Sequence, residues 1–131
     1  MAQQPIEMIL ARQWASHVSV AVFLLDDEGH LVYYNDSAAR LLGRPYEDVG
    51  DLTVSMLADT FRTYDLAGNP LPWDDLPISI ALADRRPSYL CFRYQALDGE
   101  WHDVEVCAIP IEGVGGTLLG VSAFFWEVGA P

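Results

Sequence analysis

Hydrophobic and polar residues alternate along this chain in short blocks that predict strands and helices of modest length. VSVAVFLL, over 18–25, is rich in β-branched residues and almost wholly apolar, which is typical of a buried strand. The stretch from Asp26 to Gly29 predicts a turn, because carboxylates bond nearby amides and glycine tolerates a positive φ. LVYYN, over 31–35, is then the return strand of a hairpin.

A short helix is predicted directly after this hairpin, over 37–42. Asn35 or Asp36 can cap it, because a side-chain oxygen there accepts a backbone N–H at the helix start. Gly43 suits the end of the helix, and Pro45 prevents a simple continuation.

The middle of the chain predicts shorter elements. PYEDVG and LTVSMLAD indicate helices of one and two turns, and TFRTYDLAGNPLP indicates an extended excursion that turns at 68–70. Asp74 or Asp75 is expected to cap a helix near 75–85, with Pro77 in its first turn.

Three strands are predicted to finish the chain, over 88–97, 101–110 and 117–127, with turns at Asp98-Gly99 and from Glu112 to Gly116. Two strands, several short helices and three strands predict an α+β fold, a five-stranded antiparallel sheet with short helices on one face. We expect the first and last strands to be neighbours, because that pairing buries the sheet edges best.

An amphipathic helix over roughly 5–16 precedes this pattern. Its apolar residues fall at helical spacing and form one stripe, called here the N-terminal stripe, made of Ile6, Ile9, Leu10 and Trp14. This stripe is too apolar to face water alone, and an isolated helix of about 12 residues is marginal. The helix is therefore expected to pack on a further surface.

Composition narrows the class of protein. The chain has 131 residues, 51% of them hydrophobic, which suits one domain with its own core. Its net charge of -12 disfavours nucleic acid and anionic membranes as partners, since both would be repelled. No apolar run reaches the roughly 20 residues that span a bilayer, and the N-terminus lacks the features of a signal peptide. We therefore expect a cytoplasmic protein.

The order and spacing of several residues resemble a PAS domain. In that family a strand ends in an acidic turn with glycine, a second strand ends in Asn, and a short helix ends in Leu-Leu-Gly. The matching residues here are Asp26, Gly29, Asn35, Leu41, Leu42 and Gly43, followed by Asp98-Gly99, Pro110 and Gly120. The resemblance covers about 18–128, which leaves 1–17 as a flanking helix and 129–131 as a tail.

This resemblance implies a non-enzymatic sensory or interaction domain. PAS cores often end in an Asp-Ile-Thr-like element that leads into a signalling helix, and here that place holds Trp126-Glu127-Val128-Gly129. Glu127 could take the place of the aspartate, but Gly-Ala-Pro then ends the sequence. We expect either a stand-alone sensor or a piece of a longer protein, with an effector domain or partner protein outside this chain.

The chain lacks the residues through which related domains hold familiar cofactors. Haem-binding members take a histidine from the helix that matches 75–85, and this segment contains none. Flavin-binding photosensors carry a cysteine in an Asn-Cys-Arg-Phe-Leu-Gln motif, and neither Cys91 nor Cys107 has that context. The three histidines are dispersed, without metal-ligand spacing. We therefore expect no haem, flavin or metal.

Motifs of common enzyme classes are also missing, among them Gly-x-Ser-x-Gly, Gly-x-x-x-x-Gly-Lys and His-Glu-x-x-His. Asp74-Asp75 could be paired acids, but a helix start there needs a cap. We expect no enzyme. The alternative is a small α+β enzyme with an acid–base pocket, which a carboxylate or histidine with a hydrogen-bond partner inside the cleft would favour.

An apolar interior remains as the candidate ligand site. Its expected lining, between helices and sheet, is Met56, Phe61, Ile80, Phe92, Tyr94, Val106 and Phe124. In many PAS-like domains this space holds a small ligand, which here would be apolar or amphipathic. The alternative is that the side chains fill the interior completely, since protein cores are close-packed by default.

The resemblance also suggests a role for the N-terminal stripe, because related sensors often dimerise through this flanking helix. We hypothesise a symmetric homodimer with the N-terminal stripe at its centre. The sheet face opposite the ligand-side residues offers Tyr89, Trp101 and Ile109 as further apolar area. The alternative is a monomer whose helix covers its own sheet.

The two cysteines are expected to be small hydrophobic residues of strands, reduced in the cytoplasm. Matching the apolar faces of the strands allows Phe92 to pair with Val106, which would set Cys91 opposite Cys107. A slip of one residue would separate the two thiols.

Overall fold

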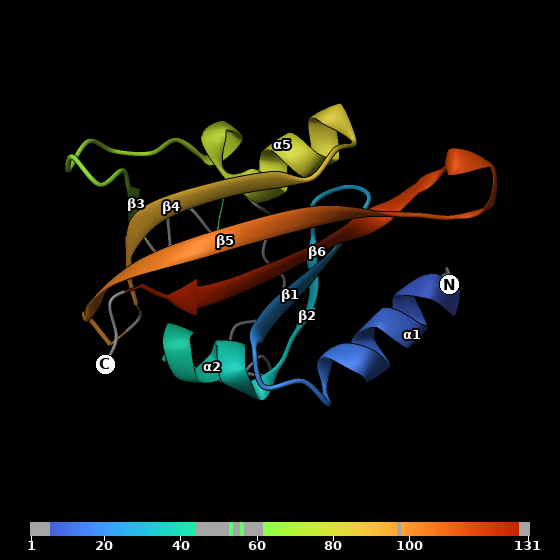
Figure 1. The fold of residues 1–131 in the computed structure, drawn as a ribbon, viewed down its shortest axis with the longest axis horizontal. Coiled ribbons are helices and arrows are strands. Elements are labelled where there is room, and N and C mark those ends of the chain that lie inside the picture. The colour runs from blue at the N-terminus through green and yellow to red at the C-terminus, as the bar shows by residue number, and fades with distance from the viewer. Residues whose placement is uncertain (1–5, 44–52, 54–55, 57–61, 97, 129–131) are drawn as a thin grey trace.

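A computed structural model describes residues 6–43, 53, 56, 62–96 and 98–128 (Figure 1). The elements are α1 (Ile6–Ala15), β1 (Ala21–Asp26), β2 (Leu31–Tyr34), α2 (Asp36–Leu42), β3 (Thr63–Tyr64), η1 (Trp73–Asp75), α5 (Pro77–Asp84), β4 (Ser88–Gln95), β5 (Trp101–Glu112), η2 (Val114–Gly116) and β6 (Leu118–Glu127). The short helices predicted at PYEDVG and LTVSMLAD fall almost entirely outside the described residues.

The strands form one antiparallel sheet in the order β2-β1-β6-β5-β4-β3 (Figure 1). The predicted α+β fold and the pairing of the first strand with the last are confirmed. The sheet has six strands rather than five, because β3 adds a two-residue edge strand in the extended excursion. A strand of two residues is too short to show a period of two in the sequence.

Two hydrophobic clusters lie on opposite faces of the sheet. The inner cluster packs the sheet against α2 and α5, with Ala38, Leu42, Ile78 and Ala81 among its buried residues. The outer cluster lies under α1 and is smaller. The domain therefore has short helices on one face, as predicted, and the N-terminal helix on the other.

Local chemistry accounts for the first hairpin and for α2. Gly29 takes a φ of 83°, and the Asp26 carboxylate accepts two backbone N–H groups in the turn, as the acidic turn predicted. Asn35 caps α2 through the Ala38 N–H, and Gly43 ends it with a φ of 88°. β1 begins three residues later than predicted, because the chain first completes the turn that ends α1.

The predicted cap of α5 is wrong. Asp74 and Asp75 lie within the 3₁₀ turn η1, and the residue before the helix is Leu76, which makes no side-chain cap. Pro77 occupies the first turn and has no N–H to satisfy, so less capping is needed there. The Ser79 hydroxyl instead donates to the Trp73 carbonyl and ties α5 to η1.

The predicted pairing of the cysteines is also wrong. Cys91 lies opposite Glu105, and Cys107 lies opposite Tyr89. The turn between β4 and β5 is centred on Asp98 rather than on Gly99, which shifts the register by two residues and leaves the faces unchanged. Both thiols are free and face the outer side of the sheet.

Candidate functional site

The interior between the sheet and the two helices α2 and α5 contains three of the residues predicted to line a ligand site. Phe92, Tyr94 and Val106 are buried in the inner cluster. Ile80 of α5 is partly buried. These positions give the interior an apolar wall.

The remaining predicted lining residues lie elsewhere or outside the described chain. Met56 is 46% exposed, and Phe61 is not among the described residues. Phe124 does not line the interior: it belongs to the outer cluster, with its ring 5.5 Å from that of Trp14. The cause is the alternation along β6, since Phe125 points inward and its neighbour must point outward.

α1 is attached to the outer face of the sheet mainly by residues outside the N-terminal stripe. Met8 and Ala15 are buried in the outer cluster. Met8 lies over Gly120 of β6, where an added Cβ would be 3.1 Å from the methionine sulfur. The four residues of the N-terminal stripe are between 46% and 67% exposed, and among them Trp14 also contacts the sheet, through Phe124.

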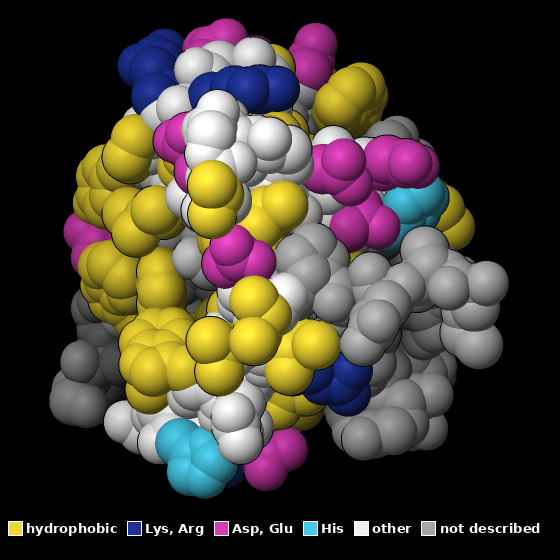
Figure 2. All heavy atoms as spheres, turned by 90° about the vertical axis from the view of Figure 1, so that its right-hand side faces the viewer, with side chains coloured by type: hydrophobic (Ala, Val, Ile, Leu, Met, Phe, Trp, Pro, Cys, Tyr) yellow, Lys and Arg dark blue, Asp and Glu magenta, His cyan; other side chains and the backbone are white. Residues whose placement is uncertain are grey.

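The sheet also exposes large side chains on its outer face. They are Tyr89 on β4, Trp101 and Ile109 on β5, and Trp126 on β6. These four residues and Glu105 of β5 are called here the outer patch. Figure 2, seen from the side where α1 begins, shows hydrophobic side chains gathered along one side of the molecule. The outer surface is thus unusually apolar for a chain of this net charge.

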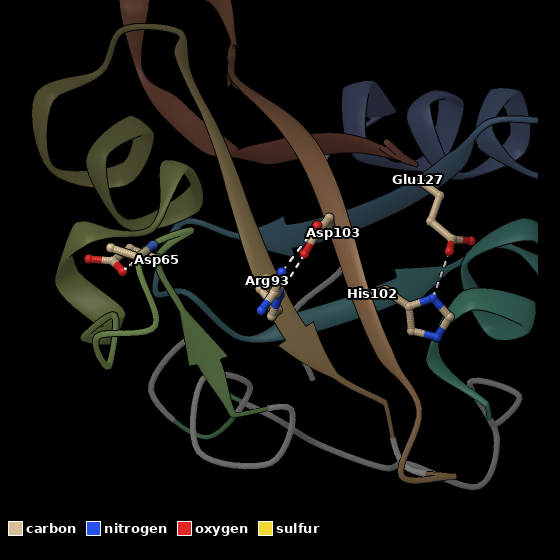
Figure 3. A network of polar contacts seen from close by, with 6 residues as sticks. Asp65, Arg93, His102, Asp103 and Glu127 are labelled. Atoms are coloured by element: carbon tan, nitrogen blue, oxygen red, sulfur yellow. Dashed lines mark hydrogen bonds and ion pairs between the residues drawn. The ribbon is translucent and has the colours of Figure 1, made fainter. Parts of the chain in front are cut away.

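Glu105 is the polar centre of the outer patch. Its carboxylate accepts the Tyr89 hydroxyl and the Trp126 indole N–H, each at 2.5 Å. The bond to Glu105 raises the pKa of Tyr89 to about 12. The nearby Arg93 is bound to Asp103 at 2.7 Å and lowers the pKa of that carboxyl (Figure 3).

Replacing Glu105 with glutamine is expected to lower the pKa of Tyr89 from about 12 toward its ordinary value of 10.0. A charged acceptor favours the protonated phenol more than a neutral amide does. Because the folded-state pKa is the higher one, the bond stabilises the fold fully below pH 10.0 and loses its contribution as the pH rises through about 12.

This pKa can be measured by an NMR titration of the Tyr89 ring carbon in the wild type and in Glu105→Gln. Glu112→Gln removes a carboxylate from the end of the same strand and should leave the pKa of Tyr89 unchanged. Equal pKa values in the wild type and in Glu105→Gln would contradict the hydrogen bond.

A second polar pair, His102 and Glu127, joins the start of β5 to the end of β6 (Figure 3). The His102 Nδ1 is 3.0 Å from the Glu127 Oε2, and the His102 side chain is 17% exposed. The His102 ring stacks on Tyr94 at 5.2 Å, and the Tyr94 hydroxyl donates to the Leu41 carbonyl at 2.7 Å. A chain of contacts therefore connects the end of α2 with the end of β6.

Burial raises the pKa of Tyr94, and the charges of Glu127 and Asp98 raise it further, so the phenol remains a donor. Among the described residues, no serine, threonine or cysteine side chain hydrogen-bonds to His102 or Glu127. This part of the chain therefore offers the pair no activated nucleophile.

Asn35 joins three elements at the start of α2. It is buried, and its Oδ1 accepts the N–H groups of Val22 and Ala38 at 3.1 and 3.0 Å. Its amide donates to the carbonyls of Ala15 and Val20 at 3.0 and 2.8 Å. The predicted capping role is confirmed, and the bond to Ala15 also fastens the end of α1 to the core.

The outer patch contains two residues that the sequence pattern did not assign to the outer face, Glu105 and Trp126. Alternation along the strand does place Glu105 on the same face as Trp101 and Ile109. Alternation alone does not predict the hydrogen bond from the Tyr89 hydroxyl to Glu105, because that contact depends on the register of β4 against β5.

Metal binding and membrane insertion find no support in the described ranges. Their His, Cys, Asp and Glu side chains form no group of three or more that could hold a metal ion. No helix in the same ranges is long and apolar enough to cross a membrane.

A family model described as a PAS domain matches residues 19–128 of this chain. Similar solved structures include the PAS domain of BvgS from Bordetella pertussis, with a TM-score of 0.64 and 18% identity over 95% of this chain and 87% of that chain. A Rhodobacter sphaeroides LOV protein gives a TM-score of 0.75 and 19% identity over 95% of this chain and 69% of that chain.

The PAS domain of nitrogen regulation protein NR(II) from Vibrio parahaemolyticus gives a TM-score of 0.63 and 17% identity over 91% of this chain and 98% of that chain. Identities this low show a shared fold alone. No curated protein matches this chain in sequence.

Proposed function

Because this chain belongs to the PAS domain family, we propose that it is a non-enzymatic sensory domain that signals through a homodimer. PAS domains are in general sensory and signalling modules. The observation that carries the dimer proposal is the N-terminal stripe, which stays exposed although α1 is already attached to its own sheet.

The attachment of α1 argues against a helix that merely covers its own domain. Such a helix would turn its largest apolar side chains toward the sheet. Here Met8, Ala15 and the ring of Trp14 make that contact, whereas Ile6, Ile9 and Leu10 face solvent. Burying this stripe against the same stripe of a second copy would remove apolar area from water, at roughly 25 cal/mol for each Å². A two-fold contact is the commonest way to achieve this.

A small apolar or amphipathic ligand in the interior is the second part of the proposal. Phe92 and Val106 supply an apolar wall. Beside them, the Tyr94 hydroxyl donates to the Leu41 carbonyl of α2, and the Tyr94 ring stacks on His102. A ligand that moved Tyr94 would disturb both its bond to α2 and its stacking on His102. The change would thereby reach the end of β6, and an effector domain or partner protein outside this chain would receive it.

The double substitution Ile9→Glu with Leu10→Glu is expected to convert a dimeric protein into a monomer. Two carboxylates at the centre of a symmetric apolar contact would face their own copies and lose hydration. Native mass spectrometry at micromolar concentration measures the oligomeric state and also detects any small molecule that copurifies.

The matched control is Leu66→Glu with Val114→Glu, which adds the same charge at exposed apolar positions outside α1. This control should remain dimeric. A monomeric wild type, or a dimer that survives Ile9→Glu with Leu10→Glu, would overturn the dimer proposal.

A further inference from the structure

We propose that the outer patch docks an apolar segment of a partner protein that places one lysine or arginine on Glu105. The inference rests on the proposed signalling function only in treating this partner as the receiver of the signal. The recognition chemistry itself follows from how the Glu105 carboxylate is held.

Two neutral donors fix the Glu105 carboxylate in position. Tyr89 reaches one oxygen from β4, and Trp126 reaches the other from β6, each at 2.5 Å. A carboxylate has about four lone-pair sites, so each oxygen can still accept a further donor. No described arginine or histidine forms an ion pair with Glu105, and the nearby Arg93 is bound to Asp103. The negative charge of Glu105 therefore has no compensating cation within the described chain.

The surroundings of this charge are largely apolar. Tyr89 and Trp126 present aromatic rings beside the carboxylate, and both are at least 40% exposed. Cys91, directly opposite Glu105, has its pKa raised by burial and by the charges of Glu105 and Asp103, so its thiol is neutral. A purely apolar surface that covered the outer patch would remove water from the Glu105 carboxylate without replacing its hydrogen bonds, which costs free energy. A cation in the covering segment removes that cost, and the aromatic rings attract a cation as well.

The negative charge of Glu105 and of the whole chain favours a different protein, rather than a second copy of this chain, as the partner. A second copy carries the same net charge of -12, and a two-fold contact through the outer patch would bring the two Glu105 carboxylates toward each other. A basic partner is instead drawn in by the field of the whole domain. The charge pattern therefore favours a basic, apolar segment from another protein or domain.

The shape of the surface favours a helix as that segment. Sheets bury an apolar face against another layer, and α2 and α5 already do so on the inner side. On the outer side α1 covers β1 and β6, whereas Tyr89, Trp101 and Ile109 on β4 and β5 stay uncovered. A helix with leucines at helical spacing and one cation among them matches this exposed strip.

The test uses two synthetic helical peptides with leucines along one face. The first has one arginine in the centre of that face, and the second has glutamine in its place. Isothermal titration against the whole chain is expected to show that the arginine peptide binds at least about tenfold more tightly. Glu105→Gln should abolish that difference, because the two changes remove the same ion pair. Asp27→Asn removes an equal charge from the first hairpin and should preserve the difference.

Three results would overturn the proposal. The first is equal binding, or no binding, of the two peptides to the wild type. The second is a loss in Glu105→Gln that is equally large for the glutamine peptide, since this would reflect a general change of the surface. The third is a dimer that dissociates when Glu105 or Tyr89 is replaced, since a second copy would then occupy the outer patch. Repeating the titration on Ile9→Glu with Leu10→Glu keeps the outcome independent of dimerisation through α1.

Discussion

Gly120→Ala is expected to lower the free energy of unfolding by about 3 kcal/mol, which is at the upper end for overpacking a core. An added Cβ would lie 2.1 Å from the Leu25 carbonyl oxygen of the neighbouring strand. That oxygen belongs to the backbone of β1, which is paired with β6, and it cannot turn aside. The same Cβ would also press on Met8, the residue that attaches α1. The substitution should therefore weaken both the pairing of β1 with β6 and the packing of α1 on the sheet.

Urea denaturation of the wild type and the variant measures this effect. Gly113→Ala is the matched control, because its Cβ would meet only the flexible Leu119 side chain and its φ is an ordinary -96°. We expect the control to change the free energy of unfolding by no more than about 1 kcal/mol. A Gly120→Ala protein as stable as the control would show that the strands are not packed this closely.

Asn35→Leu is expected to destabilise the domain by a similar amount, about 3 kcal/mol or more. The leucine has a similar size but leaves the N–H groups of Val22 and Ala38 without their acceptor. It also deprives the carbonyls of Ala15 and Val20 of a donor. Buried backbone groups without partners cost about 1–3 kcal/mol each, although neighbouring groups can find new partners in part.

Two further variants separate the roles of Asn35. Asn35→Asp keeps an acceptor for the two N–H groups but turns a negative charge toward the carbonyls, so it should also destabilise the fold. Ser37→Ala removes two exposed bonds, one to the Ser19 carbonyl and one from the Arg40 guanidinium, and should cost about 1 kcal/mol or less. Thermal unfolding ranks the stability of the three variants. An Asn35→Leu variant as stable as Ser37→Ala would contradict the role of Asn35 in joining α1, β1 and α2.

Local chemistry explains which parts of the fold could be predicted from the sequence. The acidic turn before Gly29 and the cap at Asn35 depend on residues close together in the chain, and both were predicted correctly. The cap of α5 was not, because the 3₁₀ turn at Trp73 and a proline replaced the side-chain cap. The prediction of this cap failed because more than one local structure can satisfy the backbone N–H groups at the start of α5.

Contacts between distant strands explain most of what could not be predicted. Periodicity placed Cys91 and Cys107 on one face correctly, but a register shift of two residues leaves every face unchanged and so is invisible to the pattern. The same register decides that Glu105 receives the Tyr89 hydroxyl. The inward candidate Phe124 failed for a related reason, because an apolar residue in a central strand can face either cluster.

The two attachments of α1 set how this helix can move. Met8 lies on Gly120 near one end, and the Ala15 carbonyl is bound by Asn35 at the other. The two residues are seven positions apart, about 10 Å along the axis, so they hold the helix at both ends. A small rotation or slide would break both attachments together. We therefore expect the helix to be either bound to the sheet or released, so that the signal proposed above would switch between two states rather than change gradually.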